Sequence, residues 1–200
     1  MPKTTKQYLE LKEERKNQII NGALKLFCER GFDAVNVDEI CKYVKISHGL
    51  FYHYFTSKLD LQRAIINNGQ ERNKKTREFL DNSTLTGLEY IKKSTSLILE
   101  NLKSDEMACY YYYYMIIENP PRKDDKDKRR PKVFKRLIQE IENGQKNKDI
   151  VPGDPHEILF ANFTMLIGIA LLNMKHKKTV QPMVPDLEIV MNLFYRKKDE

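Results

Sequence analysis

The stretch that decides the fold is residues 36–58, NVDEICKYVKISHGLFYHYFTSK. It predicts two short helices joined by a tight turn, with a third helix beginning directly after it. Asn36 can cap the first helix through its side-chain oxygen, and Glu39 stands where its carboxylate can reach back to the cap. Ser47 repeats the capping signal before the second helix. Helices so short need another helix to pack against, as in helix-turn-helix units.

The preceding segment supplies that packing partner. We expect a helix from about Glu13 to Arg30, with an apolar stripe made of Ile19, Ile20, Ala23, Leu24 and Phe27. Gly31 follows directly and suits a left-handed helix end, which would let Phe32 fold back on Phe27. Residues 1–11 form a polar, lysine-bearing arm, which we expect to be disordered, although such an arm can also touch phosphate or the minor groove.

The second short helix carries more polar and aromatic side chains than a buried helix of its length can accommodate. We expect its outer face to enter the DNA major groove, since side chains at the start of such a helix reach base edges and hydroxyls reach phosphates. The alternative is an ordinary helical hairpin whose tyrosines merely pack. The expected base-edge residues are His48, Gly49, Leu50 and His53, and the expected backbone contacts are Asn36, Val37, Tyr52, Tyr54 and Lys58. Ser47 is a further expected DNA-binding residue.

Residues 15–66 resemble the DNA-binding head of the tetracycline-repressor (TetR) family of bacterial regulators. The matching pieces are IINGALKLFCERGFDAVNVDEI (19–40) and VKISHGLFYHYFTSKLDL (44–61). Four residues depart from the family pattern. Asn36 stands where threonine is usual, Cys41 where alanine is usual, and Val44-Lys45 where the turn usually has Ala-Gly. The resemblance implies a homodimer that binds an operator through two such heads and responds to a small-molecule effector.

Composition agrees with this class of protein. The chain has 200 residues and a formal net charge of +7, which favours an anionic partner such as nucleic acid or an anionic membrane surface. Much of the excess lies in the run RKDDKDKRR (122–130), which is equally well explained as a solvated surface. The three cysteines, Cys28, Cys41 and Cys109, form no C-x-x-C pair, and Cys28 and Cys41 are expected to be small core residues in a reducing cytosol. We expect no signal peptide, because the N-terminus is charged throughout.

The whole pattern predicts an all-α protein. We expect a helix-turn-helix head over residues 13–73, with the helix-turn-helix itself at about 36–55. A helix capped by Ser57 would connect this head to a helical body over residues 82–200, which would bind ligand and form the dimer.

Five consecutive tyrosines, residues 110–114, stand out in the body. Tyr110 and Tyr114 share one face of a helix, and Tyr111 shares another with Met115. These four residues are candidates for the wall of a ligand pocket, since tyrosine rings can hold a flat or apolar molecule and add a hydroxyl. Plain core packing explains the same pattern equally well.

The most apolar segment is expected to be a helix from about Pro155 to Met174. A membrane span is the rival interpretation, but the segment is at the short limit for crossing a bilayer and contains Asn162, Thr164 and Asn173. A final helix is expected from Pro185 to about Lys197. These two helices suggest a two-fold dimer interface. Its expected residues are Phe163, Ile167, Gly168, Leu171, Leu187, Met191 and Phe194.

No catalytic or metal-binding pattern is evident. The four histidines have no metal-ligand spacing with carboxylates, no glycine-rich phosphate loop follows a strand, and no Ser/His/Asp set can be argued from position. The sequence therefore predicts a cytoplasmic, cofactor-free DNA-binding transcriptional regulator, with release of a repressor by ligand as the expected mode. The alternative is a helical protein–protein interaction module whose head has lost DNA binding.

Overall fold

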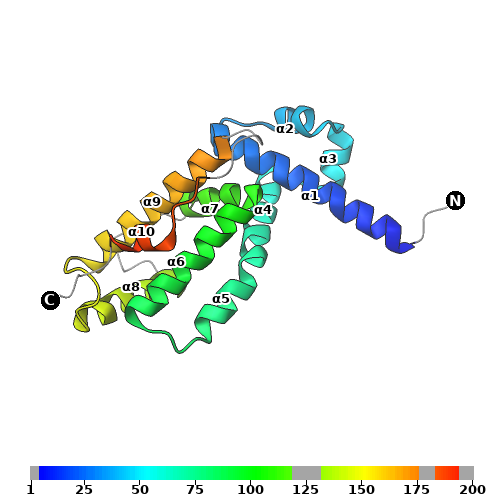
Figure 1. Ribbon diagram of the computed structural model, residues 1–200. Coiled ribbons are helices and arrows are strands. Elements are labelled where there is room, and N and C mark those ends of the chain that lie inside the picture. Colours follow the sequence, from blue (N-terminus) through cyan, green and yellow to red (C-terminus); the bar gives the residue numbers. More distant parts are fainter. Residues whose placement is uncertain (1–4, 119–131, 176–182, 194–200) are drawn as a thin grey trace. The chain divides into compact units, whose positions relative to one another are not determined.

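A computed structural model describes residues 5–118, 132–175 and 183–193 of the chain (Figure 1). Within these ranges the protein consists of ten helices and has no β-strand, as the sequence predicts. The chain divides into two compact units, Met1–Arg72 and Asn73–Glu200, which we call the head and the body.

The head contains four helices: α1 (Thr5–Arg30), α2 (Val37–Val44), α3 (His48–Tyr54) and α4 (Lys58–Arg72). Helix α1 packs against α2 and α4, and α2 packs against α3. The expectation of a disordered arm is wrong for residues 5–11, because these residues form the first turns of α1. Their side chains are exposed, so the apolar stripe that begins at Ile19 gave no sign of this extension.

The head core forms where the apolar faces of these helices meet. Its most deeply buried side chains come from all four helices: Ile19, Ile20 and Leu24 of α1, Ile40 of α2, Phe51 of α3, and Leu61 and Ile65 of α4. Gly22 allows the close approach of α1 and α2, because a Cβ atom there would overlap the Val44 side chain.

The body contains α5 (Lys74–Asp81), α6 (Gly87–Ser104), α7 (Glu106–Glu118), α8 (Lys132–Lys146), α9 (Pro155–Lys175) and α10 (Leu187–Met191). The most extensive packing joins α6 to α8 and α7 to α9. The helix that begins after Ser57, α4, ends at Arg72, and α5 starts at Lys74. The charged run at 122–130 and the C-terminal end of the predicted last helix lie outside the described residues.

Two apolar clusters form the body core. The larger one joins α6, α8, α9 and α10 and includes Tyr90, Ile141 and Met191, and the smaller one includes Leu102, Cys109 and Leu166. Desolvation, with the nearby Glu106 carboxylate as a second cause, raises the pKa of Cys109 to about 11, so this thiol stays protonated. Desolvation and Glu29 likewise raise the pKa of Cys28 to about 12. The cysteines therefore serve as small, unreactive packing residues.

Helix α9 is long and apolar enough to cross a membrane by length and composition, over Pro155–Met174. This signal is weak evidence for a span, because the core helix of a soluble protein has the same composition. Here one face of α9 packs into the body through Leu159, Phe163, Leu166, Ile169 and Ala170, all of which are buried. Burial against α7 and α8 therefore accounts for much of its apolar character.

Candidate nucleic-acid interface

The first short helix of the head starts at a complete capping box. The backbone N–H of Glu39 donates to Asn36 Oδ1 at 2.9 Å, and the Asn36 N–H donates back to Glu39 Oε2 at 2.9 Å. The Arg30 guanidinium donates to the other Glu39 oxygen at 2.8 Å. The bonds from the Asn36 N–H and from Arg30 both lower the pKa of Glu39. The cap therefore joins the start of α2 to the end of α1.

The turn between α2 and α3 is tight. Lys45 ends α2 in the left-handed region, with φ 56° and ψ 54°, and the Ile46 N–H donates to Cys41 O at 3.0 Å. A β-carbon costs about 1–2 kcal/mol in this conformation, which glycine adopts freely. The turn therefore takes the left-handed conformation even though lysine replaces the expected glycine.

The second short helix, α3, leaves one face open to solvent. Ser47 caps it, since the Leu50 N–H donates to Ser47 Oγ at 3.2 Å, and the Phe51 side chain anchors its inner face in the core. Tyr52 is 54% exposed. His48, Gly49 and His53 are also exposed, while Leu50 and Tyr54 are half-buried. The side chains predicted to contact bases and phosphates thus lie on α3, whose inner face is packed into the head core through Phe51.

Lys58 has a different environment from the one expected of a phosphate contact. Its ammonium donates to Phe32 O and to Val35 O, each at 2.8 Å, and lies 4.2 Å from the centroid of the Phe32 ring. Two of its three N–H donors therefore tie the start of α4 to the α1–α2 loop. Phe32 and Val35 lie 26 and 23 positions before Lys58 in the sequence. The sequence therefore gave no indication of these two bonds.

One contact within the interface was not predicted at all. His48 Nε2 lies 2.8 Å from Asp38 Oδ1, which links the first turn of α3 to the first turn of α2. Both side chains are exposed, His48 by 52% and Asp38 by 65%. The sequence indicated His48 as a base-edge candidate but gave no reason to single out Asp38.

Comparison with known proteins agrees with this geometry. The family model described as "Bacterial regulatory proteins, tetR family" matches residues 19–65, which run from the core of α1 into α4. Residues 19–65 therefore form a TetR-type head. Among curated relatives, the uncharacterized HTH-type transcriptional regulator YuxN of Bacillus subtilis (strain 168) is 46% identical over 55 residues. That segment is 28% of this chain and 19% of YuxN, so the similarity in sequence is confined to the TetR-type head.

Solved structures extend the likeness to the body. The ketosteroid transcriptional regulator KstR2 of Mycobacterium tuberculosis superposes with a TM-score of 0.60 at 17% identity, covering 92% of this chain and 96% of that one. The TetR family protein CprB from Streptomyces coelicolor, solved in complex with its operator sequence, gives a TM-score of 0.55 at 18% identity and covers 82% of this chain and 79% of that one. At these identities the likeness concerns the fold, in which a TetR-type head precedes a helical body.

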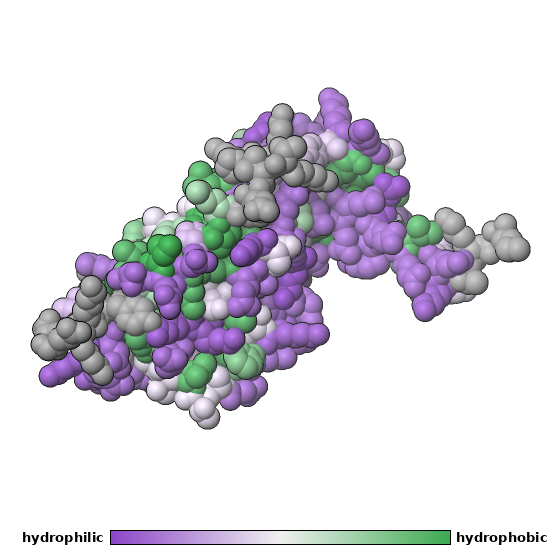
Figure 2. Space-filling view, in the orientation of Figure 1, coloured by the Kyte–Doolittle hydropathy of each residue, from purple (hydrophilic) through white to green (hydrophobic). Residues whose placement is uncertain are grey.

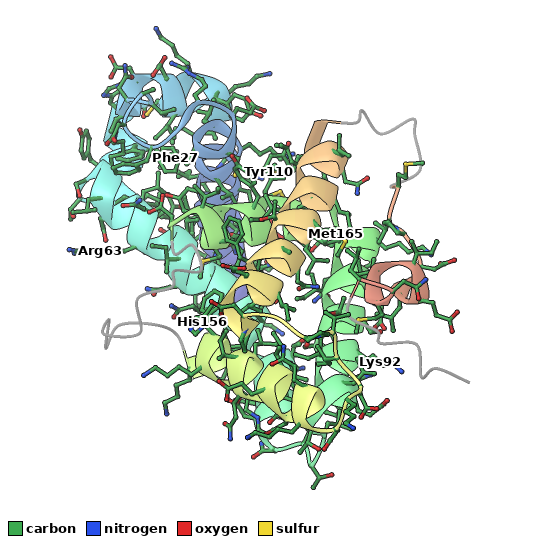
Figure 3. All side chains as sticks on the ribbon, turned by 90° about the vertical axis from the view of Figure 1, so that its left-hand side faces the viewer. Phe27, Arg63, Lys92, Tyr110, His156 and Met165 are labelled. Atoms are coloured by element: carbon green, nitrogen blue, oxygen red, sulfur yellow. The ribbon has the colours of Figure 1, made fainter. Side chains whose placement is uncertain are left out.

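The tyrosine run in the body is mostly core. Tyr110, Tyr111 and Tyr114 are buried, and the Tyr110 hydroxyl donates to Met174 O at 3.2 Å where α7 packs on α9 (Figure 3). Met115 is half-buried. Tyr112, which was not among the ligand candidates, contacts both core clusters, and burial raises the pKa of its hydroxyl.

Tyr112 Oη on α7 and Asn162 Nδ2 on α9 are among the buried polar atoms of the body that have no hydrogen-bond partner within residues 5–118, 132–175 and 183–193. An unpaired buried donor costs about 1–3 kcal/mol, so a bound molecule that accepts from it would be stabilised correspondingly. The spacing of apolar residues did not predict that either atom would be buried without a partner, because both lie on helix faces that are otherwise apolar.

The residues expected at a dimer interface fall into two groups. Phe163 is 6% exposed and Met191 is 0% exposed, so the body's own core already buries them, and the expectation for these two is wrong. Ile167, Gly168, Leu171 and Leu187 are half-buried, and Phe194 lies outside the described residues. The apolar side chains that remain exposed on α9 and around α10 were not predicted: Phe160, Leu172, Ile189 and Leu193. Figure 2 shows hydrophobic surface over the part of the body where α9 runs.

Proposed function

We propose that this chain is a sequence-specific, DNA-binding transcriptional regulator that acts in the cytoplasm as a homodimer and is released from its operator by a small molecule. The observation that carries the proposal is the exposed face of α3, held by two capped helix starts and a buried Phe51. A helix anchored on its inner face and open on its outer face suits the major groove.

Each side chain of that face has a chemical role in this proposal. His48, Gly49, Leu50 and His53 face base edges, where Leu50 can offer only apolar contact, for instance to a thymine methyl group. The hydroxyls of Tyr52 and Tyr54 contact phosphates, as does the α2 start at Asn36 and Val37. Because two N–H donors of Lys58 are held by backbone carbonyls, we assign Lys58 mainly to the stability of the head.

Dimerisation would present two such heads to successive major grooves, roughly 34 Å apart, on a near-palindromic site. The exposed apolar side chains of α9 and α10 favour a self-association surface, since an isolated chain would leave Phe160 and Leu172 more than half exposed. An effector bound at Tyr112 and Asn162 would favour release only by binding the DNA-incompetent dimer more tightly than the competent one.

The test is selection from a pool of random DNA duplexes by the purified full chain, followed by measurement of the affinity for the selected site. We expect a near-palindromic site bound by a dimer. The double variant Tyr52→Ala/His53→Ala should lose at least tenfold in affinity at unchanged thermal stability, because both side chains are exposed. Phe79→Ala, which removes an exposed aromatic ring from α5 of the body, is the matched control and should bind as the parent does.

A protein–protein interaction module with a degenerate head is the second candidate, favoured by the exposed apolar residues of α9 and α10. It predicts that no duplex is enriched over the random pool at any salt concentration below 50 mM. Enrichment of one site that depends on the α3 face excludes it.

A further inference from the structure

We propose that Asp38 is a specificity-determining residue that acts through His48: it fixes the imidazole in one tautomer, so that the ring favours bases with an amino group over bases with a keto group. The inference rests on the proposed function, since it concerns how the α3 face would distinguish DNA sequences. It goes beyond that function because Asp38 need not itself touch DNA.

The geometry determines which ring nitrogen carries the proton. Asp38 Oδ1 lies 2.8 Å from His48 Nε2, and an ionised carboxylate can only accept a hydrogen bond. Nε2 must therefore carry the hydrogen, and in the neutral ring Nδ1 is then an acceptor. Within residues 5–118, 132–175 and 183–193, no other hydrogen bond or ion pair of His48 is present.

The neighbours of the ring keep it at the helix surface. Tyr52, one turn further along α3, places its ring centroid 6.4 Å from that of His48 at an interplanar angle of 55°. The imidazole thus has two neighbours, the Asp38 carboxylate of α2 and the Tyr52 ring of α3. Both neighbours are themselves exposed, so the ring is oriented without being covered.

The chemistry of the major groove then gives the preference. Adenine N6 and cytosine N4 are amino donors, whereas guanine offers N7 and O6 and thymine offers O4 as acceptors. A neutral His48 with a fixed Nδ1 acceptor can bond the amino groups and is mismatched with the keto oxygens. One such hydrogen bond corresponds to a preference of about tenfold at one base pair of each half-site.

The experiment compares the full chain with Asp38→Asn and with Asp33→Asn, which removes the same charge from an exposed position in the same head. All three are used in selection from random duplexes at pH 8.5, where an imidazole is neutral. We expect the parent and Asp33→Asn to select adenine or cytosine at one position per half-site. Asp38→Asn should relax that preference to about twofold, because an amide can both donate and accept and so permits either tautomer.

A second measurement reads the tautomer directly. Nitrogen-15 NMR of the histidine rings should show His48 with its proton on Nε2 in the parent and a mixture in Asp38→Asn, and Asp38→Glu should restore the parent spectrum. If Asp38→Asn selects the same bases as the parent, or if its tautomer is unchanged, the proposal is overturned while the regulator function stands. If the parent selects no sequence at all, both proposals fall.

Discussion

The head and the body are both built of helices, but their helices begin in different ways. In the head, α2, α3 and α4 each start at a side-chain cap formed between residues three apart, as in the pair Asn36 and Glu39. In the body, the side chains of Asp105 and Asp154 accept backbone bonds at the starts of α7 and α9, but the residues that precede α5, α6 and α10 make no such bond. The backbone N–H of Gly87, at the start of α6, instead donates to Glu140 Oε2 of α8 at 2.7 Å. These two residues are 53 positions apart in the sequence. A local cap therefore starts each of α2, α3 and α4 in the head, whereas α6 of the body starts at a tertiary contact.

The strongest test of this contrast is Phe51→Ala. Phe51 is fully buried and joins α3 to the rest of the head core, so its loss should cost about 3–5 kcal/mol. Because the head and the body are separate compact units, we expect the head transition to be lost from a calorimetric scan while the body transition remains. Loss of both transitions together would show that the two units unfold as one.

The second test compares two glutamates that accept a backbone hydrogen bond at a helix start, Glu140 in the body and Glu39 in the head. Glu140 is buried, forms an ion pair with Arg136 at 2.7 Å and accepts from Asn143 at 3.0 Å, so Glu140→Ala leaves several groups unpaired. We expect this variant to cost about 3 kcal/mol. The matched variant in the head, Glu39→Ala, should cost clearly less than Glu140→Ala, because water can replace the bonds of an exposed carboxylate. The free energy of unfolding of each variant is measured by chemical denaturation. Equal losses in the two variants would show that local and tertiary capping contribute equally to stability.

The third test concerns a long-range polar contact of the head, the one made by Lys58. Lys58→Met keeps the aliphatic stem but removes the bonds to Phe32 O and Val35 O and the contact with the Phe32 ring. We expect a loss of about 1.5–3 kcal/mol in head stability. The dependence of DNA affinity on salt concentration should keep its slope. A slope reduced by about one phosphate contact would return Lys58 to the set of DNA-binding residues.

The smallest expected effect is a pH dependence of the head. The bonds from the Asn36 N–H and from Arg30 lower the pKa of Glu39 below its ordinary value of 4.5. A lowered pKa means that this group's stabilisation is complete above pH 4.5 and is lost as the pH falls through the folded-state value. The melting temperature of the head should therefore fall less between pH 5 and pH 3 in Glu39→Gln than in the parent. If the melting temperature falls equally in the parent and in Glu39→Gln, the carboxylate contributes no more stability than a neutral hydrogen-bond acceptor.

The short-range features of the head followed from residue type and spacing. The caps at Asn36, Ser47 and Ser57 form as predicted, and Phe32 packs edge-on against Phe27 with ring centroids 5.2 Å apart. Each needs only the helix geometry of a few neighbouring residues. Lys58 was assigned to phosphate because an exposed lysine and a lysine bound to two carbonyls look the same in sequence.

The body shows the same limit on a larger scale. Its apolar segments predicted helices correctly, but Phe163 and Met191 were expected to face a second copy of the chain and instead lie in the core of the first. An apolar side chain is equally suited to either burial, so only the packing of α9 and α10 against the other helices distinguishes core from exposed surface.

The sequence by itself determined that this protein is all-α, that its N-terminal helices form a TetR-type head, and where three of those helices begin, because each of these depends on periodicity and on bonds between near neighbours. Only the tertiary structure decided that Lys58 holds α4 to the α1–α2 loop, that Glu140 caps α6, and that Asp38 orients His48. Those contacts join side chains that are distant in sequence or on different helices, and their distances exist only once the helices have packed.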